Sequence, residues 1–174
     1  PWTLPSNTAL TIGKKINYSF IKTYNQYTKD KITVVLATKL IDKIFSKNFF
    51  EVKSETELNS FEKNQSKIPF LKFHELLGED LENINYERIW DESPLPLDNP
   101  ENAFRIISGD FVTTEDGTGI VHTAPTFGAD DYKAAKNANP EVPPLQVFDK
   151  NGNKVPIVDL KGKFIEGIGL VSGK

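Results

Sequence analysis

The sequence has no cysteine, and this absence excludes several kinds of chemistry at once. Without sulfur ligands there is no disulfide framework, no thiolate nucleophile and no cysteine-based zinc site. Only two histidines are present, His74 and His122, which leaves little for an imidazole metal cage. We therefore expect no metal in this chain.

Long apolar runs and an excess of one charge are also missing. No segment approaches the roughly 18 consecutive apolar residues that span a bilayer, and the amino terminus has neither a basic start nor an apolar signal core. With 21 Lys and Arg against 24 Asp and Glu, the net charge of −3 excludes holding a long nucleic-acid backbone by bulk attraction. We expect a soluble protein without a membrane partner, whose contacts with any nucleic acid are local.

What is present is the composition of an ordinary globular protein. Hydrophobic residues make up 38% and charged residues 26% of the 174 residues, and this length fits one domain of roughly 150 residues with a real core. Methionine is absent and the chain begins Pro-Trp-Thr, so we expect a piece of a longer protein. The sequence predicts a single domain over residues 1–174.

The first part of the chain predicts a β-hairpin followed by a short helix. Residues 15–24 alternate in polarity with period two, and residues 32–38 are apolar and rich in β-branched side chains. A polar stretch separates the two segments. Apolar residues then recur at helical spacing over residues 40–45, with Thr38 in place to cap the start.

The middle of the chain carries weaker patterns. Ser54 and Glu57 have capping-box spacing, which predicts a short surface helix over residues 54–63. From residue 68 to residue 100 the pattern is irregular, with Gly78, acidic residues and the prolines at positions 94, 96 and 100. We interpret residues 48–100 as a peripheral helical and irregular excursion rather than as part of the core sheet.

Two strands and a helix are expected next. Residues 104–113 and 119–123 read as strands joined by turn residues, which predicts a second hairpin. Asp130 and Asp131 stand where a helix of about two turns should begin, and Pro140 lies beyond its end.

The carboxy-terminal part predicts a third hairpin. Residues 145–148 and 155–158 are apolar, and Asn151-Gly152 supplies a tight turn between them. Residues 162–171 are expected to add a last strand. Short strands in hairpins with a few short helices predict a mostly β fold with an antiparallel, barrel-like core and short peripheral helices.

The segment most informative about chemistry spans residues 117–132, Gly-Thr-Gly-Ile-Val-His-Thr-Ala-Pro-Thr-Phe-Gly-Ala-Asp-Asp-Tyr. Its pattern is that of a strand, a loop with proline and glycine, and a helix start with two carboxylates. This order brings His122, at the strand end, near backbone N–H groups and near Asp131. It predicts a small pocket with an imidazole wall and an anionic corner, which suits a small cationic group.

These residues also have a purely structural interpretation. A single histidine at a strand end, such as His122, is more often a hydrogen-bonded structural residue. Asp130 and Asp131 stand where capping and the helix dipole favour carboxylates. Residue types alone favour these structural roles.

A second motif occupies the amino terminus. Residues 1–7 read Pro-Trp-Thr-Leu-Pro-Ser-Asn. The two prolines favour an extended backbone, and the indole of Trp2 can form the base of a pocket. Alone this motif is weak, because a tryptophan usually fills a core. Phosphate-binding GxxxxGK[ST], dinucleotide-binding GxGxxG, HExxH and GxSxG motifs are all absent.

Together, residues 1–7 and 117–132 closely resemble the editing, or connective-peptide, domain of isoleucyl-tRNA synthetases, which are class I aminoacyl-tRNA synthetases. Valyl and leucyl relatives share the Gly-Thr-Gly element but generally lack the Trp-Thr-Leu-Pro pattern and carry other residues where His122 stands. The resemblance extends over nearly the whole chain and is least specific over residues 48–100.

The resemblance implies a hydrolase that removes valine wrongly esterified to the 3′-terminal adenosine of isoleucine tRNA, with hydrolysis of valyl-adenylate left open. It implies that Asp131 receives the α-ammonium group and that His122 makes the pocket too short for isoleucine. Trp2 and Thr3 would line the other side. A positioned water would attack the ester, since the chain shows no obvious nucleophile and base pair.

The resemblance also implies partners and a location. These are the valine-carrying 3′ end of the tRNA, the rest of the parent synthetase and the cytoplasm, with no cofactor, since ATP serves only the parent's synthetic site. One departure is that the family's run of threonines before the Pro-Trp pair is absent here, so the fragment is expected to be weak in catalysis. The alternatives are a noncatalytic β module that binds the tRNA 3′ end, and an editing domain of a valyl or leucyl relative.

Overall fold

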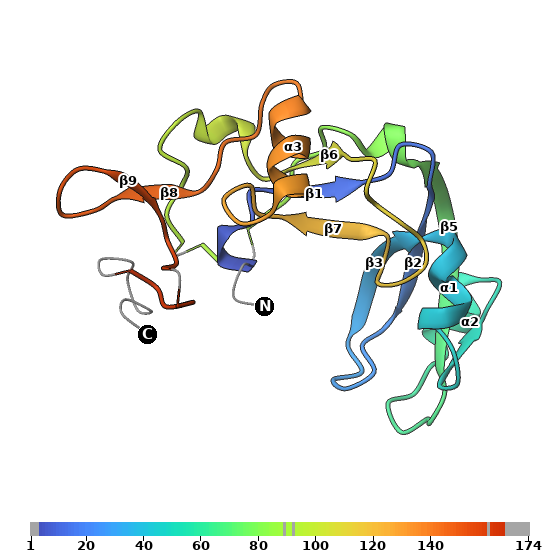
Figure 1. The fold of residues 1–174 in the computed structure, drawn as a ribbon. Coiled ribbons are helices and arrows are strands. Elements are labelled where there is room, and N and C mark those ends of the chain that lie inside the picture. The colour runs from blue at the N-terminus through green and yellow to red at the C-terminus, as the bar shows by residue number, and fades with distance from the viewer. Residues whose placement is uncertain (1–3, 89, 92, 160, 166–174) are drawn as a thin grey trace. The chain divides into compact units, whose positions relative to one another are not determined.

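A computed structural model describes residues 4–88, 90–91, 93–159 and 161–165 (Figure 1). Contacts within the chain divide it into two compact units, which are described separately. Unit 1 comprises residues 1–12, 82–111 and 121–174, and unit 2 comprises residues 13–81 and 112–120. The single domain expected from the sequence requires that both units fold cooperatively, and it stays a prediction.

Unit 1 is built on a three-stranded sheet of order β6-β1-β7. Its strands are β1 (Ala9–Ile12), β6 (Arg105–Ser108) and β7 (Ile120–Thr123), and β1 pairs in parallel with β6. Figure 1 shows β7 on the other side of β1, running in the opposite direction. The predicted hairpin of residues 104–113 and 119–123 is therefore wrong, because β1, from the amino-terminal part of the chain, lies between the two strands.

The helix α3 (Ala129–Asn137) lies against this sheet, as Figure 1 shows. It forms where the sequence predicts a helix and ends before Pro140. The small side chains of Ala134 and Ala135 face the sheet in one apolar cluster, which also contains Ala9, Ile107 and Val142. This packing fixes the position of the helix against β1 and β6.

Arg105 of β6 is a buried cation, and each of its three side-chain nitrogen atoms donates a hydrogen bond to a nearby oxygen atom. Its Nε donates to the carbonyl of Asn102 at 3.1 Å, Nη1 donates to Oδ1 of Asn83 at 2.6 Å, and Nη2 donates to the carbonyl of Pro140. Burial lowers the pKa of Arg105, and the nearby charge of Glu82 opposes that shift. Because a buried charge without acceptors is costly, these bonds tie the segment after α3 to β6.

The predicted carboxy-terminal hairpin is confirmed. Strands β8 (Gln146–Phe148) and β9 (Lys154–Pro156) pair antiparallel. In the turn, Asp149 accepts hydrogen bonds of 2.8 Å from the backbone N–H groups of Asn151 and Asn153, and these bonds, chiefly that from Asn153, lower the pKa of Asp149. Most of the strand expected over residues 162–171 lies outside the described residues.

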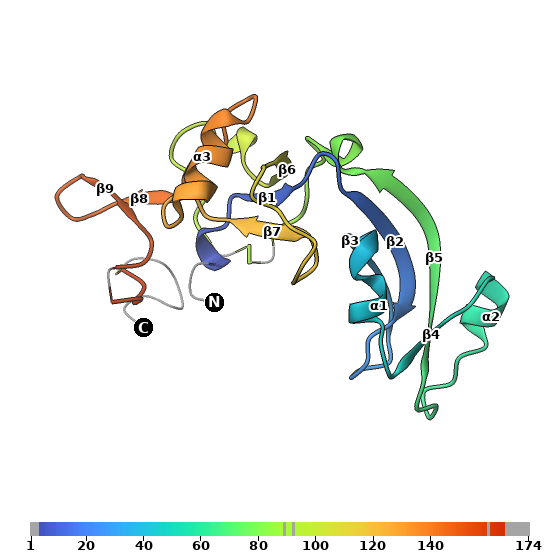
Figure 2. The same ribbon diagram turned by 45° about the vertical axis from the view of Figure 1, so that its right-hand side comes forward.

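Unit 2 contains a four-stranded sheet of order β3-β2-β5-β4. Strands β2 (Asn17–Tyr24) and β3 (Lys31–Ala37) form the predicted antiparallel hairpin. On the other side of β2 lies β5 (Ile68–Leu77), the longest described strand, and β4 (Phe49–Glu51) pairs with it in parallel (Figure 2). The interpretation of residues 48–100 as peripheral and irregular is therefore wrong for β5.

The pattern of β5 explains why it escaped prediction. Its first four residues, 68–71, are buried and the next four, 72–75, are exposed, so burial does not alternate along the strand. The pairing with β2 also shifts register between Phe20 and Ile21. A bulge of this kind bends the strands and removes the period-two signal on which sequence-based recognition depends.

The helix expected after β3 is a 3-10 turn, η2 (Thr38–Leu40), followed by one α-helical turn, α1 (Ile41–Ile44). Thr38 was expected to cap this helix, and that expectation is wrong because Thr38 is the first residue of η2. Its Oγ1 instead shares a hydrogen bond of 2.7 Å with the hydroxyl of Ser19 and donates to Glu75 at 3.1 Å. The side chain therefore links the start of η2 to β2 and β5 and does not cap the helix.

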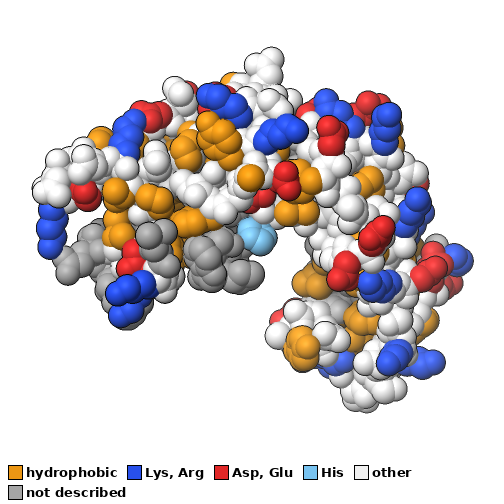
Figure 3. All heavy atoms as spheres, viewed as in Figure 1, with side chains coloured by type: hydrophobic (Ala, Val, Ile, Leu, Met, Phe, Trp, Pro, Cys, Tyr) orange, Lys and Arg blue, Asp and Glu red, His pale blue; other side chains and the backbone are white. Residues whose placement is uncertain are grey.

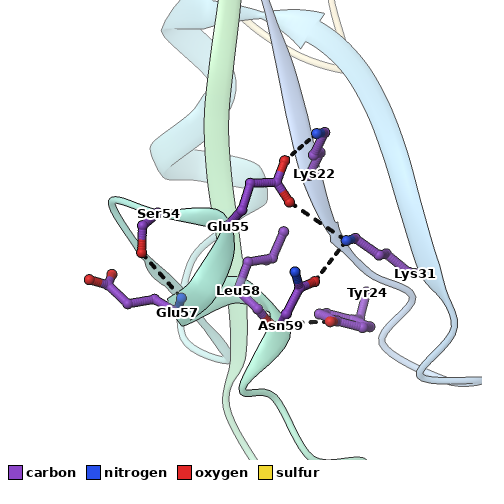
Figure 4. Close-up of polar contacts among 8 residues, drawn as sticks. All are labelled: Lys22, Tyr24, Lys31, Ser54, Glu55, Glu57, Leu58 and Asn59. Carbon is purple, nitrogen blue, oxygen red and sulfur yellow. Dashed lines mark hydrogen bonds and ion pairs between the residues drawn. The ribbon is translucent and has the colours of Figure 1, made fainter.

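The second predicted helix is α2 (Glu55–Asn59), which is shorter than expected. Ser54 caps it as predicted, since its Oγ accepts a hydrogen bond of 3.2 Å from the N–H of Glu57 (Figure 4). The Glu57 carboxylate reaches back to the N–H of Lys53 at 2.9 Å. Leu58 is the buried residue of the helix and anchors it to the sheet.

Polar contacts add to this anchor on the outside of α2. Glu55 forms exposed ion pairs with Lys22 and Lys31, and such pairs contribute less than about 1 kcal/mol each (Figure 4). The hydroxyl of Tyr24 donates to the carbonyl of Leu58 at 3.2 Å. The helix is thus attached to β2 and β3.

The expected fold class is confirmed in its main feature, a mostly β chain with a few short helices. The described strands form three separate sheets with both parallel and antiparallel pairs, and they do not close into a barrel. Three further 3-10 turns are described: η1 (Leu4–Ser6), which precedes β1, and η3 (Gly78–Leu81) and η4 (Pro100–Asn102), which lie between β5 and β6. No helix in the described part of the chain has the length and apolar character needed to cross a membrane.

Candidate functional site

His122 is the third residue of β7, and its side chain is half-buried. The next residue, Thr123, is held on several sides. Its carbonyl accepts a hydrogen bond of 3.0 Å from the N–H of Thr8, its own N–H donates to Oδ1 of Asn7 at 3.4 Å, and its hydroxyl is hydrogen-bonded to that of Thr11. The backbone that carries the imidazole is therefore well fixed at this end.

Asp131 is the third residue of α3 and is also half-buried. Its Oδ2 accepts a hydrogen bond of 2.9 Å from the backbone N–H of Ala124. The helix N-cap is Gly128, so neither Asp131 nor the exposed Asp130 caps α3. A Cβ at Gly128 would lie 2.9 Å from Cγ of Asp131, so the carboxylate packs against backbone that has no room for a larger residue.

The structure brings His122 and Asp131 into one strand, loop and helix, as the sequence predicts. The loop of residues 124–128 joins the two elements, and the carboxylate is bonded to the first residue of that loop. That the two side chains face one hollow stays a prediction. Trp2 and Thr3, the other predicted site residues, lie outside the described residues.

Two polar residues near this segment were not singled out from the sequence. Asn7 uses Oδ1 to accept hydrogen bonds from the N–H groups of Ala9 and Thr123 and from the hydroxyl of Tyr86, and so joins β1 to the end of β7. Thr126, in the loop before α3, has a buried hydroxyl without a hydrogen-bond partner among the described residues. The only sequence signal for a role of Asn7 was its position within the motif of residues 1–7. The only signal for Thr126 was its position within the motif of residues 117–132.

A cavity of about 90 Å³ lies beside Asn7. Three of its seven lining residues are aromatic and one is a cation; the lining residues are Pro5, Asn7, Tyr86, Arg88, Trp90, Ser93 and Phe104. Burial raises the pKa of Tyr86 strongly, although its bond to Asn7 opposes this. His122 and Asp131 are not among the lining residues, so this cavity is not the common hollow expected for them.

The arrangement of charged side chains in the described residues bears on metal and polyanion binding. Within the described ranges, no three His, Asp or Glu side chains are arranged to hold a metal ion. Figure 3 shows basic and acidic side chains interspersed over the face in view. Such mixing suits local contacts rather than the binding of a long phosphate backbone.

Comparison with known proteins relates the chain to a segment of much longer enzymes. It is 50% identical over 165 residues to the isoleucine–tRNA ligase of Bacteroides fragilis, 47% over 167 residues to that of Porphyromonas gingivalis, and 44% over 169 residues to that of Cytophaga hutchinsonii. These matches cover 94%, 94% and 97% of this chain, which spans 14% of the length of each relative. No protein-family model matches the chain.

Among solved structures, the crystal structure of GlLeuRS-CP1 is similar in fold, with a TM-score of 0.50 and 14% sequence identity. The match covers 94% of this chain and 54% of that one. At such low identity the likeness concerns the fold alone, and the assignment to the isoleucyl rather than the leucyl enzymes rests on sequence identity. The chain is homologous to one segment of the isoleucyl-tRNA synthetases and has the fold of a connective-peptide (CP1) domain.

Proposed function

We propose that this chain hydrolyses valine wrongly esterified to the 3′-terminal adenosine of isoleucine tRNA, as the editing domain of an isoleucyl-tRNA synthetase. Its partners are then the charged 3′ end of the tRNA and the rest of the synthetase, in the cytoplasm. The net charge of −3 is compatible with this role, since only a single-stranded tRNA end has to enter the site.

Such an enzyme needs a second site for a physical reason. Valine lacks one methylene of isoleucine, and a hydrophobic pocket distinguishes the two by only about 1 to 3 kcal/mol, a range known for this very class of enzyme and not obtained from this structure. A synthetic site of this kind therefore releases some valyl-tRNA. A site that admits valine and excludes isoleucine corrects the error.

The observation that carries the proposal is the attachment of Asp131 to Ala124, two residues after His122. One carboxylate oxygen, Oδ2, is used to fix the side chain, and Oδ1 makes no hydrogen bond within the described residues. A fixed carboxylate with a free oxygen suits a charge-assisted hydrogen bond to the α-ammonium group of an aminoacyl ester. His122 then limits the length of the amino-acid side chain, with Trp2 and Thr3 on the opposite side.

Hydrolysis in this arrangement proceeds by attack of a positioned water on the ester carbonyl carbon. The bond to the ribose 3′ oxygen breaks, that oxygen takes up a proton, and free valine and tRNA are released. The protein orients the ester through the ammonium group and polarises its carbonyl with backbone N–H groups or hydroxyls. A neighbouring ribose hydroxyl assists the transfer of the proton.

The test measures the release of amino acid from preformed valyl-tRNA and isoleucyl-tRNA by the full-length synthetase that contains this segment. Fast loss of valine with retention of isoleucine is expected. Loss of neither, with tRNA binding preserved, would instead identify a noncatalytic module that binds the tRNA 3′ end. Equal loss of both would contradict the proposed exclusion of isoleucine.

A further inference from the structure

The hairpin of β2 and β3 and the short helix α1 border an apolar groove of about 330 Å³. This volume lies within the range of roughly 300 to 1,000 Å³ that is typical of ligand pockets. The lining includes four aromatic rings, those of Tyr24, Tyr27, Phe45 and Phe49, and no charged side chain. Figure 2 shows α1 beside these two strands. All of the lining residues belong to unit 2, so the geometry of the groove is set within that unit.

Three of the four rings are held in place by their neighbours. Phe45 packs edge-to-face on Phe49, with ring centroids 5.0 Å apart. The ring of Tyr24 lies 4.6 Å from that of Phe61, and its hydroxyl donates to the carbonyl of Leu58. Because these side chains are already ordered, little conformational entropy is lost there when a ligand binds.

Tyr27 differs from the other three, because it is 85% exposed at the tip of the hairpin. Its backbone is nevertheless ordered, since its N–H donates to Oδ1 of Asn25 at 2.8 Å and the N–H of Asn25 donates to the carbonyl of Asp30 at 2.8 Å. The amide nitrogen of Asn25 makes no hydrogen bond within the described residues and is an available donor. The hairpin tip thus carries an uncovered ring and a polar group on a fixed backbone.

The segment that forms most of the groove is basic, although the whole chain is acidic. Residues 25–49 contain five lysines and two aspartates, whereas all 174 residues together have a net charge of −3. Lys31 pairs with Glu55 and Lys43 pairs with Asp116. The other three lysines of this segment form no ion pair within the described residues: Lys29, Lys39 and Lys47.

Two of these cations flank the groove in the sequence. Lys29 follows Tyr27 by two residues, and Lys47 follows Phe45 by two residues. An aromatic groove next to unpaired lysines is typical of sites for single-stranded nucleic acid, in which bases stack on rings and phosphates pair with cations. An uncharged apolar partner would make no use of these lysines. The charge therefore favours a polyanionic strand as the occupant.

We propose that this groove binds a short segment of single-stranded RNA, with a base stacked on Tyr27 and the adjoining phosphates paired with Lys29 and Lys47. That the strand is an unpaired segment of the tRNA rests on the proposed function, whereas the affinity of the groove for single-stranded RNA does not. The contact is local, with one base and two phosphates, and involves none of the predicted site residues.

The test uses the full-length synthetase and a short single-stranded oligoribonucleotide that carries 4-thiouridine. Near-ultraviolet irradiation should cross-link it to peptides from residues 23–36 and 44–49, and the yield against RNA concentration measures the affinity of this groove alone. We expect Tyr27→Ala to weaken that affinity about tenfold, as for loss of one base–aromatic stack. Phe50→Ala is the matched control, because Phe50 is an exposed aromatic residue of the same unit that does not line the groove.

Lys29→Gln combined with Lys47→Gln tests the phosphate contacts separately. The slope of log affinity against log salt concentration should become shallower by about 1.4, since each phosphate contact of a single strand contributes about 0.7. Lys67→Gln should leave the slope unchanged, because Lys67 is an exposed lysine of the same unit outside residues 25–49. An unchanged slope in the double variant would overturn the phosphate contacts.

The remaining outcomes separate this inference from its alternatives. An affinity of Tyr27→Ala equal to that of Phe50→Ala would overturn the groove as an RNA site. Absence of RNA cross-links, with amine-reactive cross-links from Lys29 and Lys47 to another part of the synthetase, would also overturn it and show a surface covered by protein. Unlabelled isoleucine tRNA should compete with the oligoribonucleotide, and failure to compete would overturn the tRNA as the source of the strand. A synthetase that hydrolyses neither ester but retains the cross-links overturns the proposed function alone.

Discussion

The Oδ2 atom of Asp131 accepts a 2.9 Å hydrogen bond from the backbone N–H of Ala124, so the first turn of α3 is tied to the residue that follows β7. This bond gives Asp131 a structural role in addition to the binding role proposed for it. A useful variant must therefore remove the charge and keep the bond.

Asp131→Asn meets that requirement, because its amide oxygen can still accept from Ala124. We expect hydrolysis of valyl-tRNA to fall about 10- to 100-fold, since a neutral amide loses a charge-assisted bond to the ammonium group. The measurement is the rate of valine release, with Asp130→Asn as the control for a lost charge on an exposed neighbour. Unchanged turnover in Asp131→Asn would remove the carboxylate from substrate binding.

His122→Ala should allow hydrolysis of isoleucyl-tRNA, because loss of the imidazole makes room for one more methylene. The rate of isoleucine release should rise at least about tenfold while valine release changes little. His74→Ala is the control, because His74 is the only other histidine and is exposed on β5. Continued protection of isoleucyl-tRNA in a folded His122→Ala enzyme would exclude the imidazole as the specificity wall.

A comparison of Gly119→Ala with Gly117→Ala distinguishes steric crowding of an added Cβ from backbone strain as causes of lost stability. Both glycines have positive φ, but a Cβ at Gly117 meets nothing within 4 Å, whereas one at Gly119 meets Ala37 at 2.5 Å. We expect urea denaturation to show a loss of about 1 kcal/mol in the free energy of unfolding for Gly117→Ala and about 2 to 4 kcal/mol for Gly119→Ala. Equal losses would show that the turn is not confined by β3.

Alkaline pH should destabilise the chain through its buried tyrosines. Burial raises the folded-state pKa of Tyr86 above the unfolded value of about 10, so the stabilisation is fully present below pH 10 and is lost as pH rises through the folded pKa. The free energy of unfolding, measured by urea denaturation at pH 8, 10 and 11, should therefore decline above pH 10. Tyr86→Phe should make this decline shallower and Tyr27→Phe, at an exposed position, should not. A decline of the same steepness in Tyr86→Phe and the wild type would contradict the assignment.

Local sequence patterns were sufficient to predict the structure where it depends on residues close together in the chain. The hairpins of β2 with β3 and of β8 with β9 have strands joined by short turns, and Ser54 caps α2 through a residue three positions away. The strand, loop and helix around His122 and Asp131 is equally local, and its order was predictable from proline, glycine and aspartate positions.

Pairings between distant segments were not predictable. In the structure β1 lies between β6 and β7, and β5 lies beside β2 with a register shift. Which strands pair depends on which distant segment offers unpaired backbone groups, and the local sequence does not contain this information. Nothing in the local sequence of Asn7 or Tyr18 shows that one holds Thr123 and the other holds Gly119.

The sequence by itself determined the mostly β class, the local hairpins and the two motifs that relate the chain to isoleucyl-tRNA synthetases, because these depend on residue type and short-range spacing. Only the tertiary structure decided the order of the strands, the attachment of Asp131 to Ala124 and the burial of the Tyr18 hydroxyl against Gly119. The physical reason is that buried polar groups must find partners, and which partner is within reach is set by the packing of segments far apart in the chain.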